Sequence, residues 1–592
     1  MPSISSAAKR LMIPAAVLLL ALAGPPSRAA ATEAEKAPAD GSPWGIAFGA
    51  GTDTDRVFEM LPGAGVRWAR LFPEWGQLQP KPDEWNWKPA DDLLSRAEKN
   101  GVRVSGIFLY FAPWASSPKE GETQHGALTR TFPVKNMDYW RNYVRAVVGR
   151  YGAKIKSWEV WNEPNSTSFN IKGTPRDYAD MVREAYVTAK QVDPECRIGI
   201  GVADADISYL DQVIAQGAAD HFDFVAVHPY SILGRVMQGR EMTYLGLVAN
   251  LRKMLASRHQ RADLPLWITE IGVQSTNDAG KEQRQADGVV KAYAMGLAQG
   301  FERIFWFEAR GPSYGPDGDH GLLRQDYTPR PAYTAYQGMA RLLGREPRCV
   351  GWLNLEGRSY GFVFQGQAGP VLVAWAAGAG DVRVKFPSPV RTVDLAGKET
   401  AVAAGEEVVL TARPLFIRDL PGALAAQAKA QAAQRFPWSK DFSGAPRVSC
   451  RLGTPDGDAG VIHLEDGSVA GAAGDVPACR TDKAAKHEYL YFDVDNSYAA
   501  FGDNTLEITV AACRTDPSKN AGMNLFYEST GRYRLSDEWW TIPEGPGWHE
   551  HTFRLQDANF ADNWGWNFAA NAVSSPSDFW VKEVRVKRVA AK

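Results

Sequence analysis

Eight short apolar runs, separated by longer stretches of helical pattern, constrain the fold of this chain more than any other feature of its sequence. Apolar strands that alternate with helices are typical of a parallel sheet covered on both faces. The runs start at Trp44, Val66, Val104, Ser157, Arg197, Phe224, Leu266 and Arg303. Eight such units within about 300 residues are expected of a (β/α)8 barrel. We therefore predict an α/β fold in which residues 43–343 form a (β/α)8 (TIM) barrel.

A doubly wound parallel sheet is the alternative that this alternation leaves open. Such a sheet usually has fewer strands and a glycine-rich turn after its first strand. Here the segment after Phe48 contains Gly49 and Gly51 but no third glycine. The dinucleotide-binding fingerprint is therefore weak, and the barrel is the preferred interpretation.

The rest of the chain changes its periodicity. In residues 344–421 apolar and polar residues alternate between turn residues, which predicts a small antiparallel β-domain. Residues 422–436 are rich in Ala, Gln and Lys and are interpreted as a linker, flexible or partly helical. Residues 437–592 again consist of strand-like runs, which predict a C-terminal β-sandwich of the jelly-roll kind.

Tryptophans are frequent in the predicted sandwich: Trp539, Trp540, Trp548, Trp564, Trp566 and Trp580. Aromatic rings can stack on the apolar faces of sugars, and they can also fill a core. The sandwich is therefore either a carbohydrate-binding module or a rigid structural appendage.

The N-terminus is typical of an export signal. Residues 1–31 contain the basic pair Lys9-Arg10, an apolar run of about 13 residues and, after it, small residues of the kind found at a signal-peptide cleavage site. A membrane-spanning helix needs about 20 apolar residues, and this run contains Pro14, so an uncleaved anchor is the weaker alternative. Residues 32–42 are predicted to be a disordered lead-in. We expect a secreted or periplasmic bacterial protein with no stable membrane span after signal cleavage.

Charge and cysteine content exclude several classes of partner. The formal net charge is −2 and no basic block is present, so nucleic acid is not expected to bind. The five cysteines are not spaced like a zinc site, and we predict no metal and no organic cofactor. Export permits one disulfide among Cys450, Cys479 and Cys513.

Two glutamates carry the chemistry that the sequence predicts. Functional side chains of a barrel lie at the carboxyl ends of its strands. Glu163, in Trp-Asn-Glu-Pro, ends the fourth run, and Glu270, in Ile-Thr-Glu-Ile-Gly, ends the seventh run 107 residues later. Two carboxyl groups about 5–5.5 Å apart hydrolyse glycosides with retention, one as acid/base and one as nucleophile. We predict Glu163 as the acid/base and Glu270 as the nucleophile.

Other strand ends supply the predicted substrate-binding residues, which are Arg70, Trp114, Asn162, His228, Tyr230, Trp306 and Glu308. Arg70 and Tyr230 are expected to keep the nucleophile ionised, and Asn162 to hydrogen-bond the sugar 2-hydroxyl. Alternatives remain open for several of them: an ion pair for Arg70, a core position for His228, and packing for Trp114 and Trp306. For Glu308 two alternatives are equally supported: a contact with the substrate and a structural ion pair. Glu159 is expected low in the barrel or in an ion pair.

The run from Trp158 to Asn165 resembles the acid/base signature of clan A glycoside hydrolases, and Thr269-Glu270-Ile271-Gly272 resembles their nucleophile strand. The segments 75–87 and 321–336 are also similar to members of that clan. Family 39, which includes bacterial exopolysaccharide hydrolases, is the most similar family, over roughly residues 44–420. The resemblance implies that Arg70, the His228–Tyr230 run and Trp306 contact the substrate or the nucleophile.

These observations lead to one hypothesis and two alternatives. The hypothesis is a retaining glycoside hydrolase that cleaves O-glycosidic bonds of an extracellular or periplasmic polysaccharide by double displacement, acting within the chain. An exo-acting glycosidase of the xylosidase, arabinofuranosidase or uronidase type is the first alternative. A non-catalytic polysaccharide-binding protein is the second. In each case the expected partner is a polysaccharide or an oligosaccharide.

Overall fold

The computed structural model describes residues 41–49, 51–116, 133–170, 172–315, 318–355, 358–378, 380–434, 441–454, 457–464 and 467–589. Residues from Gly41 onward belong to one compact unit. The predicted export signal and most of the predicted lead-in lie outside the described residues. Among the described residues, none of the helices has the length and apolarity that a membrane crossing requires.

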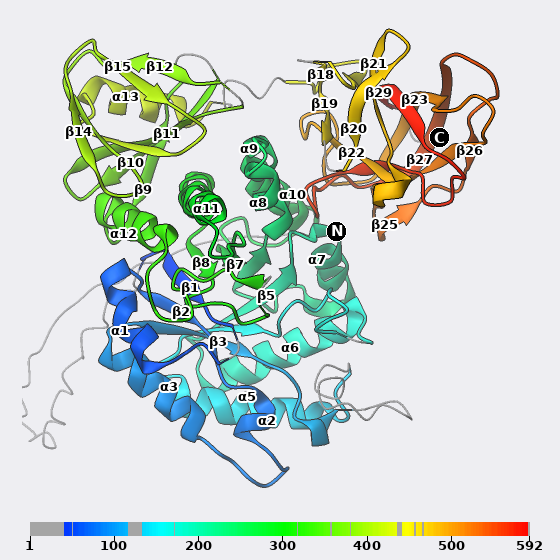
Figure 1. Cartoon of the computed structure of the whole chain (residues 1–592). Coiled ribbons are helices and arrows are strands. Elements are labelled where there is room, and N and C mark those ends of the chain that lie inside the picture. Colours follow the sequence, from blue (N-terminus) through cyan, green and yellow to red (C-terminus); the bar gives the residue numbers. More distant parts are fainter. Residues whose placement is uncertain are drawn as a thin grey trace, which may run out of the picture. The chain divides into compact units, whose positions relative to one another are not determined.

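Eight parallel strands close into a barrel in sequence order, with β1 pairing to β8, and helices surround it (Figure 1). The strands are β1 (Trp44–Ala47), β2 (Trp68–Arg70), β3 (Arg103–Phe108), β4 (Ser157–Val160), β5 (Arg197–Ala203), β6 (Phe224–His228), β7 (Leu266–Ile271) and β8 (Arg303–Phe307). The predicted (β/α)8 barrel is therefore confirmed.

The helical elements of the barrel region are α1 (Asp55–Ala64), α2 (Trp75–Leu78), α3 (Lys88–Lys99), η1 (Pro113–Ala115), α5 (Met137–Tyr151), α6 (Pro175–Val192), α7 (Ile207–Val213), η2 (Ile214–Ala218), α8 (Tyr230–Val236), α9 (Glu241–Leu245), α10 (Leu247–Ser257), α11 (Ala279–Gln299) and α12 (Pro331–Leu343).

Helix α6 is an example of how the sequence forms and positions one of these helices. Thr174 caps its first turn and Pro175 opens it. Its buried Tyr178 donates to the Val160 carbonyl (2.8 Å) and accepts from Gly201 N–H (3.0 Å), which ties the helix to β4 and β5.

The amino-terminal end of the barrel is filled by a cation between two aromatic rings. The guanidinium of Arg303 lies 3.7 Å from the ring centroid of Trp68 and 4.3 Å from that of Trp267. Phe224 stacks on Trp267 at 3.9 Å. Because this end is plugged, a ligand is expected to enter from the carboxyl ends of the strands.

Antiparallel sheets follow the barrel, as predicted. A six-stranded sheet runs in the order β14-β13-β16-β11-β10-β9, beside a two-stranded pair β12-β15. Their bounds are β9 (Arg348–Trp352), β10 (Ser359–Gly366), β11 (Gly369–Ala376), β12 (Val382–Lys385), β13 (Val390–Val393), β14 (Glu399–Val402), β15 (Glu407–Leu410) and β16 (Leu415–Arg418). The segment interpreted as a linker contains α13 (Gly422–Gln431), whose Ala428 is buried against this sheet's core.

The C-terminal strands form a larger antiparallel sheet with its own core. Their bounds are β17 (Val448–Arg451), β18 (Asp458–Ala459), β19 (Val461–Leu464), β20 (Val469–Ala473), β21 (Val476–Arg480), β22 (Tyr489–Val494), β23 (Asn504–Arg514), β24 (Gly522–Ser529), β25 (Arg532–Leu535), β26 (Trp540–Thr541), β27 (His549–Ala558), β28 (Phe568–Asn571) and β29 (Phe579–Arg588), with the short helix η4 (Lys483–Ala485). We refer to β17–β29 as the C-terminal sandwich. Among the described residues, none of the cysteines forms the disulfide that the sequence permitted.

A buried ion pair joins the barrel helices to the six-stranded sheet. Lys291 of α11 lies 2.9 Å from Glu241 of α9, and the same carboxylate oxygen accepts from the indole N–H of Trp375 at 3.0 Å. The side chains of Lys291 and Glu241 are only 6% and 1% exposed, so neither charge is solvated by water. Each group therefore depends on the other for its stabilisation.

We predict that Lys291→Met lowers the free energy of unfolding by about 3–5 kcal/mol, because it leaves the Glu241 carboxylate buried without its cation. Urea unfolding of the full chain measures the loss. Lys281→Met, at an exposed position of the same helix, is the control and should be nearly neutral. Adding Glu241→Gln to Lys291→Met should restore part of the stability, and a failure to do so would contradict the ion-pair explanation.

Candidate active site

The two predicted glutamates meet at the open end of the barrel. One carboxylate oxygen from Glu163, one from Glu270 and a ring nitrogen of His228 all lie within 4.8 Å of one another. The side chains of Glu163 and Glu270 are 15% and 14% exposed, whereas that of His228 is 1% exposed. The two carboxyl groups are thus partly accessible, whereas the imidazole of His228 beside them is buried.

Arg70, at the end of β2, binds three oxygen-bearing side chains at once. Its Nε donates to Glu159 at 2.7 Å, one terminal nitrogen to Glu270 at 2.6 Å and the other to Asn162 at 3.1 Å. The two carboxylates hold the pKa of Arg70 above its usual value although burial alone would lower it. Arg70 therefore serves both as an ion-pair partner and as a fixed positive charge beside Glu270, and the expected ion pair of Glu159 is confirmed.

Glu163 is presented by a loop with unusual backbone angles. Strand β4 ends at Val160, and both Trp161 (φ 64°) and Glu163 (φ 49°) lie in the left-handed region that L-residues rarely occupy. Side-chain donors hold this loop: Asn170 bonds the Pro164 carbonyl, and the Trp161 indole N–H donates to Phe169 at 2.9 Å. These contacts fix the direction in which the Glu163 carboxyl points.

A chain of hydrogen bonds fixes the tautomer of His228. Thr269 Oγ1 donates to Glu159 at 3.2 Å, so it accepts from His228 Nε2, which lies 3.0 Å away. His228 Nδ1 then faces Glu163 Oε1 at 2.9 Å, and one proton can be shared between them. Burial by itself would lower the pKa of His228, but the charge of Glu270 and the bond to Glu163 outweigh burial and raise it.

Glu270 receives a second hydrogen bond from Tyr230, at the start of α8, whose hydroxyl donates at 3.0 Å. Burial and the negative charges of Glu270 and Glu163 raise the pKa of Tyr230 well above its usual range, so it stays a donor. The pairing of β7 with β8 shifts register between Ile268 and Ile271. This irregularity lets the consecutive side chains of Thr269 and Glu270 both reach the site, which a regular strand would not allow.

Two of the predicted substrate-binding residues are placed away from the open space. Trp306 is fully buried, and its indole N–H donates to the His320 carbonyl at 3.3 Å. Side chains alternate along β8, and Phe305 and Phe307 face the barrel interior with Trp68, so Trp306 faces the helices. Its prediction as a sugar contact is corrected: Phe307 is the aromatic side chain of β8 that lies beside Tyr230, with ring centroids 6.4 Å apart.

Glu308 is also fully buried, which is at odds with a direct substrate contact. It accepts from Ser313 N–H at 3.3 Å, and burial raises its pKa to about 7. Trp114, in η1, is half-buried; its indole N–H donates to the Gln79 carbonyl at 2.8 Å and its ring packs edge-on against Trp75. The structure therefore groups Arg70, Asn162, His228 and Tyr230 around the two glutamates, but not Trp114, Trp306 or Glu308.

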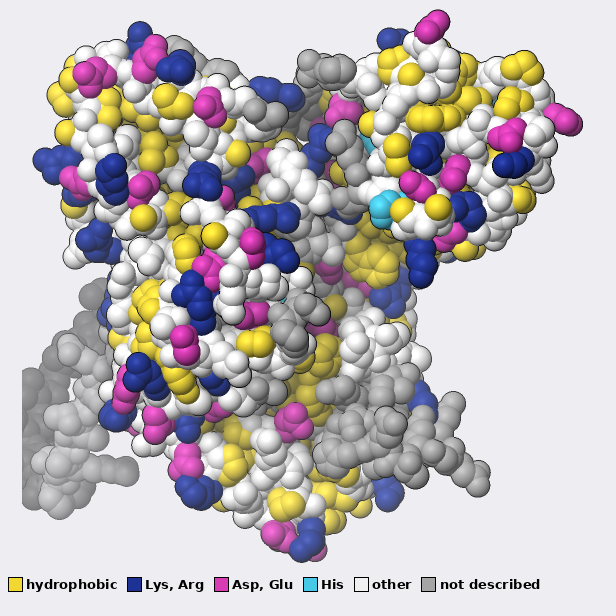
Figure 2. Space-filling view, in the orientation of Figure 1, with side chains coloured by type: hydrophobic (Ala, Val, Ile, Leu, Met, Phe, Trp, Pro, Cys, Tyr) yellow, Lys and Arg dark blue, Asp and Glu magenta, His cyan; other side chains and the backbone are white. Residues whose placement is uncertain are grey.

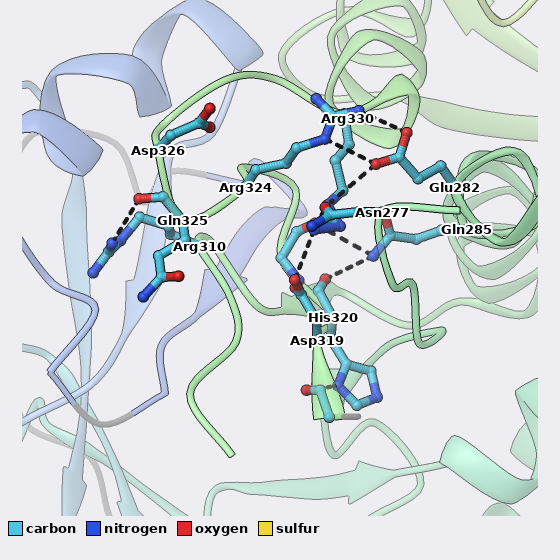
Figure 3. A network of polar contacts seen from close by, with 12 residues as sticks. Asn277, Glu282, Gln285, Arg310, Asp319, His320, Arg324, Gln325, Asp326 and Arg330 are labelled. Carbon is cyan, nitrogen blue, oxygen red and sulfur yellow. Dashed lines mark hydrogen bonds and ion pairs between the residues drawn. The ribbon is translucent and has the colours of Figure 1, made fainter. Parts of the chain in front are cut away.

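The loop after β8 is held in place by a buried arginine (Figure 3). Arg330 donates to Asp319 at 2.6 Å and to Asn277 at 3.0 Å, and Gln285 of α11 donates to the His320 carbonyl at 2.9 Å. The ring of His320 lies 6.0 Å from that of Tyr230. This network therefore orders the wall of the site behind the Tyr230–Glu270 pair.

Several functional contacts were not predicted. Thr269 connects His228 to Glu159, and Asp204, after β5, accepts the His228 N–H through its carbonyl at 2.9 Å. The alternation of side chains in β4 and β7 was the available signal for Glu159 and Thr269, since both residues face the barrel interior. No comparable signal marks Asp204.

The Glu163–His228–Glu270 group has the ligand types of a metal site. However, the guanidinium of Arg70 already binds Glu270, and it places a positive charge where a cation would otherwise compensate the carboxylates. A shared proton and an arginine therefore fit these residues better than a metal ion.

Comparisons with known proteins give consistent results. The profile of glycosyl hydrolase family 10 matches residues 73–337, which contain both glutamates. Endo-1,4-beta-xylanase 3 of Hypocrea jecorina is 23% identical over 297 residues, covering 48% of this chain and 75% of that protein. A beta-xylosidase of Caldicellulosiruptor saccharolyticus is 29% identical over 235 residues, covering 36% of this chain and 48% of that protein.

Among solved structures, the fold is similar to that of a family 39 glycoside hydrolase from the gut symbiont Bacteroides cellulosilyticus WH2. The TM-score is 0.51 at 21% sequence identity, over 64% of this chain and 81% of the other. At 21% sequence identity, this similarity is evidence of a similar fold.

We predict that His228 stabilises the folded protein more at low pH than at high pH. Its pKa is raised above 6.5 in the folded state, so the stabilisation is complete below the unfolded pKa and is lost as pH rises through the folded one. The difference in unfolding free energy between the wild type and His228→Gln should be larger at about pH 5.5 than at about pH 9. His221→Gln is the control, and an equal difference at both pH values would contradict the prediction.

Proposed function

We propose, from the premise that this chain is an O-glycosyl hydrolase of clan A, that it cleaves glycosidic bonds by double displacement with retention. The match to the family 10 profile and the similarity to the fold of a family 39 structure agree with the resemblance drawn from the sequence motifs. The observation that carries the proposal is the separation of the two carboxylates, which have one oxygen each within 4.8 Å. Inverting enzymes keep their carboxyl groups about 6.5–9.5 Å apart to admit a water molecule, and retaining enzymes about 5–5.5 Å.

Glu270 is the nucleophile in this mechanism. Arg70 and Tyr230 each donate to one of its oxygens and so orient the carboxylate that must attack the anomeric carbon. Asn162 accepts from Arg70 through its amide oxygen, so its amide N–H groups remain to donate to the sugar beside the nucleophile.

Glu163 is the acid/base. The hydrogen bond between Glu163 and His228 Nδ1 keeps one proton at this pair. Glu163 delivers that proton to the leaving oxygen in the first step and accepts a proton from the attacking water in the second. The environments of the two glutamates differ in the required sense, because a cation contacts Glu270 and an imidazole contacts Glu163.

The proposed substrate is a polysaccharide outside the cytoplasm, cleaved within the chain. The names of the sequence relatives, an endo-1,4-beta-xylanase and a beta-xylosidase, make β-1,4-xylan the first substrate to test and keep an exo-acting enzyme as the alternative. The proposed export rests on the signal-like residues 1–31. Lys and Arg are interspersed with Asp and Glu on the face in Figure 2, which favours a neutral polymer over nucleic acid.

We predict that Glu270→Gln abolishes turnover, because the amide cannot form the glycosyl ester. A 2-fluoro glycoside of the substrate sugar should label Glu270 in the wild type, as read by peptide mass spectrometry. Glu98→Gln, an exposed barrel position, is the matched control and should keep full activity. Undiminished turnover by Glu270→Gln, or a label on Glu159 or Glu308, would sink the assignment.

The size of the products decides between endo and exo action. Purified protein is incubated with β-1,4-xylan, other soluble polysaccharides and aryl glycosides, and the products are measured by mass spectrometry. We expect oligosaccharides of several lengths from the start of the reaction. Release of monosaccharide alone would favour the exo-acting alternative.

A further inference from the structure

A hollow lies between the barrel and the C-terminal sandwich, next to the segment that follows β5. It has a volume of about 650 Å3, within the range of about 300–1,000 Å3 that is common for ligand pockets. Asp204 lines it from the loop after β5, and Ser231 and Arg235 line it from α8. His487, Tyr491, Trp564 and Trp566 line it from the sandwich. We call this hollow the junction pocket.

Buried contacts hold the sandwich against this side of the barrel. Asn563 accepts from Ile207 N–H at 2.9 Å and donates to Ser208 at 3.2 Å. Arg532 pairs with Asp206 at 3.0 Å, and its guanidinium also donates to the carbonyl of Asn165, two residues after Glu163. The sandwich is therefore fastened to the loop that carries the proposed acid/base.

Asp204, which lines the junction pocket, also contacts the Glu163 side of the active site. Asp204 accepts the backbone N–H of His228, the residue that holds Glu163. Together with burial, the charge of Glu163 contributes to a pKa of about 7 for Asp204. An acid that protonates the leaving oxygen must lie on the side of the leaving group. Sugar units beyond the cleaved bond therefore lie on the side of Glu163, and Asp204 lines the junction pocket on that side.

The chemistry of the lining suits a sugar. Trp564 is 38% exposed, although it stacks on Tyr533 with ring centroids 4.8 Å apart. A supported but accessible indole is a rigid platform for the apolar face of a pyranose ring. Asp204, Ser231 and Arg235 add polar side chains at the other wall, where Ser231 N–H donates to the Asp204 carboxyl group at 3.4 Å.

We propose that the junction pocket is a subsite for the leaving-group part of a polysaccharide, with Trp564 as its stacking platform. The proposal rests on the proposed function, because it takes its direction from Glu163 as the acid. It gives the sandwich a role in catalysis, because the sandwich then binds the same substrate chain that the barrel cleaves.

A kinetic comparison tests the subsite. β-1,4-Xylohexaose places sugar units beyond the cleaved bond, whereas 4-nitrophenyl β-xylobioside places only a nitrophenyl group there. Trp564→Ala should lower kcat/KM for xylohexaose about tenfold, equivalent to about 1.4 kcal/mol, and leave that for the aryl substrate unchanged. Trp564→Phe, which keeps a flat ring, should retain most of the activity. Trp539→Ala is the matched control, since Trp539 is also 38% exposed but lies outside the junction pocket.

Equal losses on the two substrates would overturn the proposal, because they indicate a structural effect. An unchanged kcat/KM for xylohexaose would overturn it as well.

A binding measurement separates this failure from a failure of the proposed xylan substrate. In native gels that contain arabinoxylan, carboxymethylcellulose or galactomannan, Glu270→Gln should be retarded by at least one polymer. Adding Trp564→Ala should weaken that retardation, and adding Trp539→Ala should not. Unchanged retardation with Trp564→Ala, or no retardation of Glu270→Gln by any polymer, would overturn the subsite whatever the activity assay shows.

Discussion

The bonds of one guanidinium determine the geometry of the site. Arg70 is buried and joins Glu159 of β4, Glu270 of β7 and Asn162 of the loop after β4. A planar group with donors in fixed directions sets the relative positions of these three side chains, which a lysine could not do. Two carboxylates share this single cation, so Arg70 attracts Glu270 without cancelling all negative charge around it. The nucleophile proposed here is thereby oriented, and a fixed positive charge lies beside it.

The remaining contacts make that geometry rigid. The barrel is plugged at its amino-terminal end by Arg303 between two tryptophans. At the open end, Tyr178 ties α6 to β4 and β5, and Arg330 orders the loop after β8. Preorganised groups of this kind need little rearrangement when charge develops in the reaction. The sandwich takes part as well, since Arg532 bonds the loop that follows Glu163.

Much of the architecture and part of the site could be predicted from sequence. The apolar runs predicted the eight strands, and the strand ends predicted which side chains gather around Glu163 and Glu270. Trp306 lies away from the two glutamates for a definite reason. Side-chain direction at the end of a strand depends on the register, and a shift of one residue exchanges the two faces. Along β8 the inward positions are Phe305 and Phe307, so Trp306 is turned toward the helices.

The sequence by itself determined the barrel, the antiparallel sheets after it and the two glutamates at the ends of β4 and β7. These follow from local periodicity and from residue types at strand ends, which a single chain displays directly. Only the tertiary structure decided that Glu163 meets His228, that Arg70 divides its bonds between Glu159 and Glu270, and that Trp564 of the sandwich lines a pocket beside Asp204. These contacts join segments that are 65 to 360 residues apart. They depend on strand register, the irregularity in β7 and the docking of the sandwich, and no local pattern encodes any of the three.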